Sequence, residues 1–425
     1  MLLATQLLIG LAMVPRAPPS GGGHATAASA AVDTRPLTVC TTASSLEGVA
    51  FCKHALEGGN FRVRALCRNP DSYRARELAS MGAEVVVADN NDLHSLVQAF
   101  EGAHSVYAIT TWSGSSFTSD GTVVRSENLD SRHLEESEVS QGANILRAAE
   151  RTPTLRHFLL QSMHRGGRSE PPDPSTPAPL HHRAKWRQEE ALFASSELAC
   201  AWSVLRQPTY MENFANDETA AQGTQLRLLR PGVVSGLLAE EDELTVIAVD
   251  DLGAIAAAIL REGPQRHGGR VIAAGAERIS GRSLAAAAER AHGAAAFQYR
   301  QVPWFVLEYF IPVEYPRQLK RWLTRGGNDQ GAVEEEAAAM FAESRRLHPG
   351  LMSMEDFLVE KGIRNLPVPL AQRLTSGGGG APRREVLAYA SALVPAALAA
   401  SLNGLPSALR PTLPMASLLA SREKP

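Results

Sequence analysis

The sequence predicts an α/β protein built on a doubly wound parallel sheet, followed by a smaller and mainly helical C-terminal cap region. Short apolar strands alternate with helix-like segments from Leu37 to Ile109, a pattern typical of a parallel sheet with helices on both faces. The alternation resumes as far as Ala273. From Trp304 to Gly362 the pattern is aromatic and helical, which predicts a cap over the ligand-binding edge of the sheet.

Seven segments have the composition of strands: Leu37–Cys40, Arg62–Cys67, Glu84–Ala88, Ser105–Ile109, His157–Gln161, Ala201–Leu205 and Arg270–Ala273. Helical spacing of apolar residues marks the segments between them, namely Leu46–Leu56, Ser72–Met81, Asp92–Phe100, Glu135–Glu150, His181–Phe193 and Asp250–Leu260. Asn91 or Asp92 is suited to cap the third of these helices, and Ser353 to cap the last helix of the C-terminal region.

We divide the chain into a leader (residues 1–36), an α/β domain (37–275), a cap and substrate or partner region (276–367) and a low-complexity tail (368–425). The leader has an apolar run, Leu2 to Val14, and no acidic residue before Asp33. This composition suits a cleaved targeting segment as well as a disordered leader without a targeting signal. The expected location is therefore cytoplasmic or, with a transit peptide, a plastid or mitochondrion.

The composition excludes several classes of function. A net charge of -3 leaves no basic excess for a nucleic acid backbone, so we expect no direct nucleic acid partner. No segment is long enough to span a membrane comfortably. The four cysteines form no CxxC pair, which argues against a zinc site and a disulfide framework. We therefore expect no metal.

The first strand, loop and helix have the layout of a dinucleotide-binding unit. In such a unit, glycines in the loop let the backbone turn sharply and approach a pyrophosphate. Here the loop from Thr41 to Gly48 reads TTASSLEG. Arg68 lies twenty positions beyond Gly48, where an arginine suits the 2′-phosphate of NADP. A solvated arginine at a strand end is the alternative interpretation.

Several stretches together resemble the NmrA-like family of atypical short-chain dehydrogenase/reductases, across roughly Leu37 to Leu366. FRVRALCRNP at Phe61 is similar to the second strand of the family and its NADP-selecting arginine, and LRQPTYMENF at Leu205 to the segment after strand six. AVDDLGAIAAAIL at Ala248 and the closing MSMEDFLVEKG are similar to its late helices. The resemblance implies a Rossmann domain that binds NADP(H). Members act as reductases or as NADP-responsive regulators of protein partners.

The resemblance also implies positions for the site. The three glycines of the family fall at Thr42, Ser45 and Gly48, and its glutamine at Glu47. We expect strain at Thr42, intrusion of the Ser45 side chain and repulsion of phosphate by Glu47. The hydroxyls of the loop, including that of Thr41, are possible replacement donors, so binding should be weakened rather than lost.

A second group of positions concerns catalysis. Lys185 matches the lysine that holds the nicotinamide ribose, but His181 stands where active enzymes have the proton-donating tyrosine. His181 is a candidate acid near neutral pH, or a structural residue. Ser162 occupies the place of a substrate-binding serine, and Asn213 matches the segment that faces the nicotinamide or caps a turn.

Three functions remain open at this stage. We favour a redox-responsive regulator or weakly active oxidoreductase that binds NADP(H), with a small-molecule substrate or a regulatory protein as partner. The alternatives are an NADPH-dependent reductase of a small carbonyl or quinone-type substrate, and a cofactor-free scaffold. The oligomeric state does not follow from the sequence.

Overall fold

The computed structural model describes residues 33–112, 116–117, 123–124, 131–164, 178–214, 229–236, 239–301, 334–369 and 372. The chain divides into two units, Met1–Arg35 and Pro36–Pro425. In the first unit, the Arg35 guanidinium pairs with the Asp33 carboxylate at 2.6 Å. The leader, the tail and residues 304–333 lie almost wholly outside the described residues, so what we expect of them stays a prediction.

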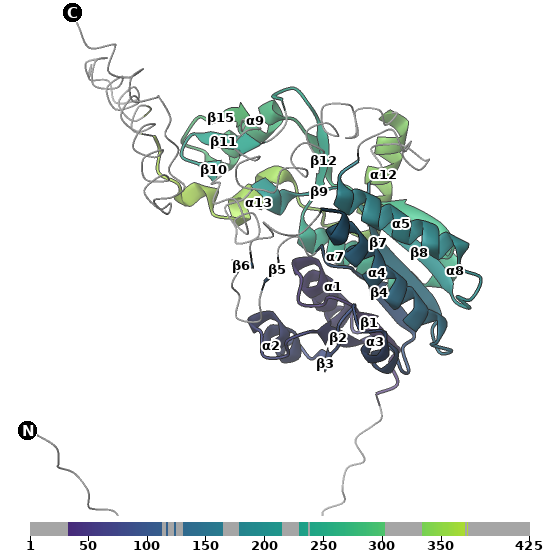
Figure 1. Cartoon of the computed structure of the whole chain (residues 1–425). Coiled ribbons are helices and arrows are strands. Elements are labelled where there is room, and N and C mark those ends of the chain that lie inside the picture. Colours follow the sequence, from purple (N-terminus) through teal and green to yellow (C-terminus); the bar gives the residue numbers. More distant parts are fainter. Residues whose placement is uncertain are drawn as a thin grey trace, which may run out of the picture. The chain divides into compact units, whose positions relative to one another are not determined.

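The second unit is built on a seven-stranded sheet with the order β13-β8-β7-β4-β1-β2-β3 (Figure 1). Every strand pair in it is parallel. The strand order reverses between β1 and β4, which is the switch point of a doubly wound sheet. Ligands of such sheets bind outside the carboxyl ends of the strands at that point.

The strands of this sheet are β1 Leu37–Cys40, β2 Arg62–Cys67, β3 Glu84–Val87, β4 Ser105–Ala108, β7 His157–Met163, β8 Ala201–Gln207 and β13 Arg270–Ala273. All seven predicted strands are confirmed, with ends that differ by two residues or fewer. The prediction works because these strands lie between two helical layers. Both faces are then apolar, and β1 and β4 are buried at every residue.

Helices cover both faces of the sheet. On one face lie α1 Leu46–Glu57, α2 Tyr73–Ser80 and α7 Val249–Glu262, and on the other α3 Leu93–Ala99, α4 Ser131–Glu150 and α5 Leu180–Ala194. A short helix, α8 Pro264–His267, follows α7. The predicted cap of α3 is confirmed at Asp92, whose carboxylate accepts the His94 N–H at 2.9 Å.

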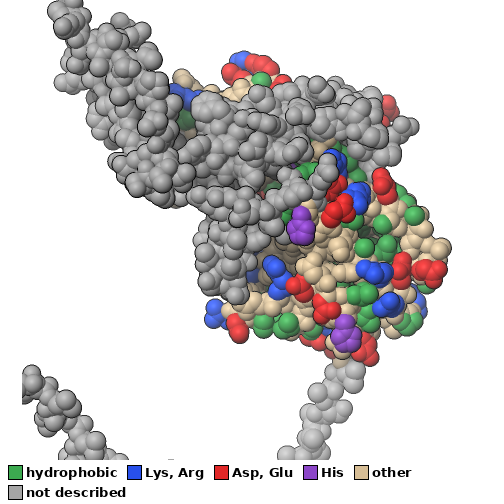
Figure 2. Space-filling model, in the orientation of Figure 1, with side chains coloured by type: hydrophobic (Ala, Val, Ile, Leu, Met, Phe, Trp, Pro, Cys, Tyr) green, Lys and Arg blue, Asp and Glu red, His purple; other side chains and the backbone are tan. Residues whose placement is uncertain are grey.

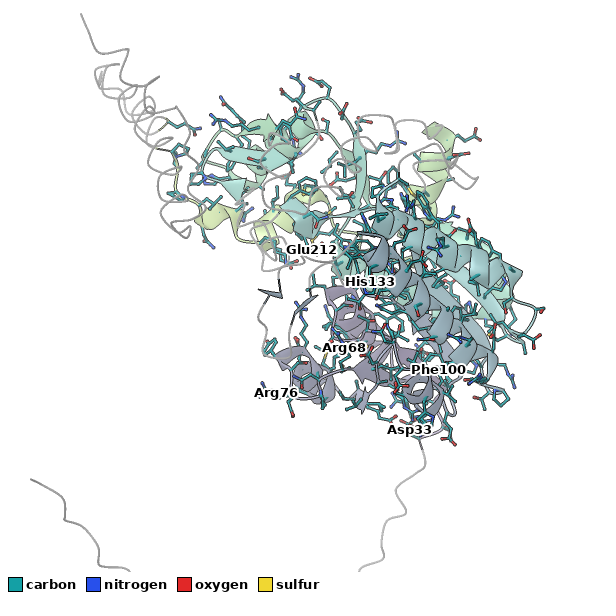
Figure 3. The ribbon with its side chains drawn as sticks, viewed as in Figure 1. Asp33, Arg68, Arg76, Phe100, His133 and Glu212 are labelled. Carbon is teal, nitrogen blue, oxygen red and sulfur yellow. The ribbon has the colours of Figure 1, made fainter. Side chains whose placement is uncertain are left out.

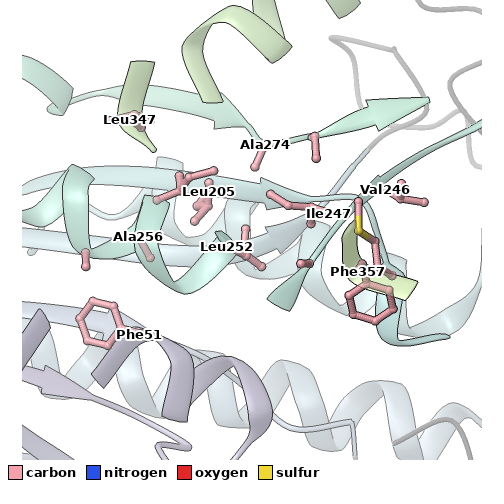
Figure 4. Close-up of a cluster of buried hydrophobic side chains, with 14 of the residues drawn as sticks. Phe51, Leu205, Val246, Ile247, Leu252, Ala256, Ala274, Leu347 and Phe357 are labelled. Atoms are coloured by element: carbon pink, nitrogen blue, oxygen red, sulfur yellow. The ribbon is translucent and has the colours of Figure 1, made fainter. Parts of the chain in front are cut away.

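The core on the α1 face depends on close contact between two helices. A Cβ atom on Gly253 of α7 would lie 2.5 Å from the Ala50 carbonyl carbon of α1, so the two backbones touch directly. Phe51, Leu252 and Ala256 belong to the apolar cluster around this contact (Figure 4). The contact fixes α1, and with it the loop that precedes α1.

The described residues also form three small sheets. They are β14 Glu277–Ile279 with β12 Leu244–Ile247 and β9 Thr209–Tyr210; β10 Leu229–Arg230 with β11 Val233–Gly236 and β15 Gln298–Gln301; and the pair β5 Ser116–Phe117 and β6 Val123–Val124. None of these strands was predicted from the sequence. Because β9 begins directly after β8, its sheet lies beyond the carboxyl edge of the main sheet.

The described C-terminal residues are mainly helical, with α9 Gly281–His292, α12 Glu334–Leu347, α13 Met354–Glu360 and the 3₁₀ turn η3 Ile363–Asn365. Ser353 caps α13, since its hydroxyl accepts the Asp356 N–H at 3.1 Å, as predicted. Helix α13 packs on α9, and α12 on α7.

The surface and the helices add two observations. On the face shown in Figure 2, acidic and basic side chains of the described residues are interspersed. None of the helices in the described part of the chain combines the length and the apolar character that a bilayer span requires.

Candidate functional site

The loop between β1 and α1 keeps a glycine-like backbone at Thr42. Its φ is +50°, which makes it the only non-glycine residue of the described chain in the left-handed region. This conformation costs about 1 to 2 kcal/mol for an L-residue. The Thr42 hydroxyl donates to the Ile109 carbonyl at 2.8 Å, and the Asn90 amide donates to the Thr42 hydroxyl at 2.9 Å. These bonds hold the strained residue in place.

Two of the loop hydroxyls are used inside the protein. Thr41 and Thr42 both donate to the Ile109 carbonyl at 2.8 Å, so neither has a hydrogen left for a phosphate. This corrects the expectation that they are replacement donors. Ser45 instead caps α1, because its hydroxyl accepts the Gly48 N–H at 2.9 Å. That bond takes one N–H of the first turn away from any anion.

Gly48 has the role expected of the last glycine in such a loop. A Cβ atom there would lie 2.6 Å from the Thr42 carbonyl oxygen and 2.7 Å from the Ala43 Cα. No real Cβ atom approaches so closely, so only glycine lets α1 pack on the loop. The loop therefore keeps the path of a dinucleotide-binding loop although two glycines are replaced.

Glu47 points into the core instead of towards the outside of the loop. The residue is 5% exposed, and its carboxyl group contacts Tyr107 and lies 2.8 Å from the Tyr210 hydroxyl. Burial raises the pKa of Glu47 above its ordinary value, although the two phenols act in the opposite direction. The inward position of this carboxyl group was not expected from the sequence, and the repulsion of phosphate by Glu47 stays a prediction.

Arg68 lies at the carboxyl end of β2, with an exposed side chain (Figure 3). A second arginine, which the sequence analysis missed, contacts the loop itself: Arg74 of α2 donates to the Ser44 carbonyl at 3.2 Å. Arg76 follows on the same helix and is exposed. The sequence feature that could have identified these arginines is the run RNPDSYRAR, which has three arginines within nine residues from Arg68 onward and so concentrates positive charge beside the loop.

Lys185 is buried at the carboxyl edge of the sheet, between the ends of β4 and β7. Its ammonium donates to the Thr110 hydroxyl at 2.8 Å and to the Gln161 side chain, and it lies 3.2 Å from a carboxylate oxygen of Glu138. The Thr110 carbonyl is also within 3.3 Å. An ammonium has three hydrogens, so these contacts use its whole hydrogen-bonding capacity. The Glu138 partner on α4 was not foreseen from the sequence.

Two buried oxygens beside this cluster have no hydrogen-bond partner among the described residues. They are the second carboxylate oxygen of Glu138 and the hydroxyl of Ser162. Ser162 lies on β7 next to Gln161 and is 0% exposed. Unpaired buried polar atoms are uncommon in proteins, and here they occur where the resemblance places a substrate-binding serine.

His181 lies one helical turn before Lys185 on α5. Its ring makes edge contacts with Trp112, at 5.8 Å between centroids, and with His182, at 4.4 Å. Burial, together with the positive charge of Lys185, lowers the pKa of His181 to about 3. The imidazole is therefore neutral near pH 7, and this corrects the expectation of a histidine acid at that pH.

Asn213 is exposed, on the 3₁₀ turn η1 Met211–Phe214. Its neighbour Glu212, labelled in Figure 3, is buried, and both oxygens of its carboxylate accept the Val249 N–H, at 3.1 and 3.2 Å. Glu212 thus caps α7, a role that the sequence analysis assigned to no residue. Among the described residues, no cluster of His, Cys, Asp and Glu is arranged to hold a metal ion.

Comparisons with known proteins identify the family and the fold of the chain. The model of the NmrA-like family matches residues 38–358. Two curated relatives are NmrA-like family domain-containing oxidoreductases of Aspergillus. The protein hkm9 of Aspergillus hancockii is 43% identical over 65 residues, which are 15% of this chain and 19% of that protein. The protein himF of Aspergillus japonicus is 28% identical over 120 residues, or 28% of this chain and 32% of that protein. The matches thus span a third or less of these relatives.

Solved structures share the fold. NmrA, a negative transcriptional regulator in complex with NAD, superimposes with a TM-score of 0.57 at 18% identity, over 80% of this chain and 98% of that chain. The NADPH-dependent quinone oxidoreductase QOR2 of Escherichia coli, complexed with NADPH, gives a TM-score of 0.54 at 17% identity, over 76% and 99%. At these identities the likeness shows the fold. With the family match over most of its length, the chain belongs to the NmrA-like family.

Proposed function

We propose that this protein binds NADP(H) with reduced affinity and acts as a nucleotide-responsive binding protein with little or no reductase turnover. The expectation of little or no turnover rests on the enclosure of Lys185. A lysine that assists hydride transfer must reach the nicotinamide ribose, whereas the ammonium of Lys185 is already bonded to Thr110, Gln161 and Glu138.

The residues present fit a dinucleotide. Gly48 keeps α1 close to the loop, and the N-terminus of α1 presents a positive partial charge to a pyrophosphate. Arg68, with Arg74 and Arg76 nearby, suits the 2′-phosphate. Against this, Ser45 occupies the Gly48 N–H and Thr42 is strained. These opposing features support binding that is weakened but not lost.

The bound nicotinamide would supply a hydride, and the protein would then have to supply a proton. His181 stands where the family of active enzymes has tyrosine, and its low pKa leaves no imidazolium at neutral pH. NmrA is named a regulator and QOR2 an oxidoreductase, so proteins with this fold include both kinds of function. The neutral imidazole of His181 supports the regulator.

The test pairs binding with turnover on the same preparation. We expect saturable NADPH binding by fluorescence, together with no sustained oxidation of NADPH in the presence of a panel of small carbonyls and quinones. Sustained turnover that is lost on Lys185→Ala would contradict the proposal. Because this substitution removes a buried cation, circular dichroism must show that the variant is folded before its activity is compared.

The second candidate is an NADPH-dependent reductase of a small carbonyl or quinone-type substrate. One observation favours it: the buried hydroxyl of Ser162 has no described partner and could bind a carbonyl oxygen. This candidate predicts that Ser162→Ala lowers turnover while NADPH affinity is unchanged. A third candidate, a cofactor-free scaffold, predicts that Arg68→Ala leaves thermal stability unchanged with and without NADP⁺.

A responsive binding protein needs an output, and we propose a regulatory protein partner or a small-molecule ligand near the cap region. Pull-down with and without NADP⁺ would detect a partner whose binding depends on the nucleotide. The compartment depends on whether the leader is a transit peptide, and N-terminal sequencing of the mature protein tests whether the leader is removed.

A further inference from the structure

The carboxyl group of Glu47 joins the nucleotide loop to the segment after β8. Glu47 is in the first turn of α1, Tyr107 is on β4, and Tyr210 is on β9. Both phenols contact the carboxyl group, and the Tyr210 hydroxyl also contacts the Gln207 side-chain oxygen. One side chain thus links the helix that would receive the phosphates to the turn that carries Asn213.

Counting hydrogens in this cluster gives a definite result. The amide nitrogen of Gln207 is turned towards the Met163 sulfur at 3.3 Å, so its oxygen is the atom that accepts from Tyr210. The cluster then contains three acceptor oxygens, two on Glu47 and one on Gln207, but the two phenols have only two hydrogens. A proton on Glu47 completes the set, because Glu47 then donates to Tyr210 and Tyr210 donates to Gln207.

Burial favours the neutral form of Glu47, whereas the hydrogen bonds of the two phenols and the charge of Lys185 favour the ionised form. The titratable groups that face it are Tyr107, Tyr210 and the thiol of Cys40, while Lys185 acts on it from a greater distance. No cation forms an ion pair with Glu47 in the described part of the chain. Burial raises the pKa values of both tyrosines, so their hydrogens stay in place at neutral pH. A buried carboxylate without a cation is costly, and such groups tend to hold a proton instead.

We propose that Glu47 carries this proton and acts as a positioning residue of the nucleotide site, so that ionisation of Glu47 weakens NADP(H) binding. Neutral Glu47 holds the first turn of α1 and Tyr210 in one chain of hydrogen bonds. Ionised Glu47 loses one of these bonds and adds a negative charge beneath the helix end that receives the pyrophosphate. The inference rests on the proposed binding of NADP(H) and adds a dependence on pH to it.

Glutamine is the matched substitution for this test. In Glu47→Gln, the side-chain nitrogen donates to Tyr210 as the protonated acid does, and it has no charge to gain at high pH. The control is Glu57→Gln at the exposed end of the same helix, where the side chain is 62% exposed. The probe is NADP⁺, which tolerates acid. The 2′-phosphate of NADP⁺ itself titrates near pH 6. This affects the wild type, Glu47→Gln and Glu57→Gln equally and so does not change their comparison.

The dissociation constant of NADP⁺ is measured from pH 5 to 8.5 by tryptophan fluorescence. At pH 8.5 we expect the wild type to bind NADP⁺ about ten-fold more weakly than Glu47→Gln, which corresponds to a difference of one unit in the Glu47 pKa between the free and the bound protein. At pH 5 the two dissociation constants should be equal. Glu57→Gln should follow the wild type. Parallel curves for wild type and Glu47→Gln would overturn the inference while leaving the proposed function intact.

Thermal unfolding without nucleotide separates the two proposals. A raised pKa in the folded protein means that stability is fully present below the unfolded pKa and is lost as pH rises through the folded pKa. Glu47→Gln should therefore melt higher than the wild type at pH 8, with a difference that shrinks towards pH 4.5. If Glu47→Gln melts lower than the wild type at pH 8, Glu47 does not carry the proton, whether or not NADP⁺ binds. If no protein in the series binds NADP⁺, the proposed function is contradicted instead.

Discussion

The β1–α1 loop and the Lys185 cluster lie at the carboxyl edge of the same sheet, and both depart from the pattern that the NmrA-like resemblance implies. They depart in opposite ways. In the loop the side chains have changed, but the backbone keeps its path through Thr42 at positive φ and through the close approach at Gly48. In the Lys185 cluster the lysine is kept, but Glu138 and its neighbours enclose it.

The difference shows what each region can still do. A loop with the right backbone can bind an anion through N–H groups whichever side chains it carries, so its function can be weakened gradually. A lysine that assists catalysis must reach the reacting atoms, so enclosing its ammonium removes the function at once. The proposed function, binding with little or no turnover, combines the two, and four predictions test the comparison.

The largest effect is expected at the Lys185 cluster. In Glu138→Gln the Lys185 ammonium stays buried without a carboxylate, and removal of one partner of a buried pair costs about 3 to 5 kcal/mol. The measurement is the free energy of unfolding in urea. Glu136→Gln on the same helix is the control, because its pair with Arg187 is exposed and is worth about 1 kcal/mol or less. Equal losses in the two variants would mean that Lys185 is not enclosed.

The next effect tests the backbone path of the loop. Gly48→Ala puts a Cβ atom within 2.6 Å of the Thr42 carbonyl oxygen, and such overpacking costs about 1 to 3 kcal/mol. Gly58→Ala at the other end of α1 is the control, because its nearest neighbour would be 3.3 Å away. Denaturant unfolding compares the two variants. If Gly48→Ala is as stable as Gly58→Ala, the loop does not have the described path.

A third prediction concerns the replaced glycines. Restoring glycine at Thr42 and Ser45 together should tighten NADP(H) binding ten-fold or more, on the order of 1.4 kcal/mol. Ser45→Gly should account for most of it, since it frees the Gly48 N–H, whereas Thr42→Gly mainly relieves strain that is present with and without nucleotide. Calorimetric titration of the single and double variants with NADP(H) measures how much each substitution contributes to the gain in affinity. Unchanged affinity in the double variant would show that the loop is not the obstacle.

The smallest effect concerns the helix pair that supports the loop. Asp250 on α7 bonds with His54 and Lys53 on α1, at 3.0 Å each, and these contacts lower the pKa of Asp250 to about 2. A depressed pKa contributes stability above the unfolded value, and that stability is lost as pH falls from about 4 towards 2. Asp250→Asn should remove about 1 kcal/mol of this acid dependence, because the side chain is 46% exposed and screened. Identical acid unfolding curves would contradict it.

Much of the fold was predictable because its signals are local. Each strand of the main sheet is an apolar run, and caps such as Asp92 and Ser353 act within a few residues. The small sheets were not predictable, because β11 pairs with β15 from a distant part of the chain and β15 is a polar segment. The strands β5, β6, β9 and β10 have only two residues each, too few to show a periodicity.

The site was predictable in position but not in contacts. The sequence placed Thr42, Gly48, Arg68 and Lys185 near the carboxyl edge, since each follows or precedes a recognisable strand or helix. It gave no sign that Glu47 turns inward, because Tyr107 and Tyr210 lie 60 and 163 residues further along the chain. The enclosure of Lys185 likewise depends on Glu138 of another helix.

The most direct test of the account is a fluorescence titration of the wild type with NADPH and NADH, repeated on Arg68→Ala. The account predicts saturable binding of both nucleotides, with NADPH tighter by about ten-fold, the value of one charged hydrogen bond to the 2′-phosphate. Arg68→Ala should abolish that preference. Absence of saturable NADPH binding at millimolar concentration would contradict the account.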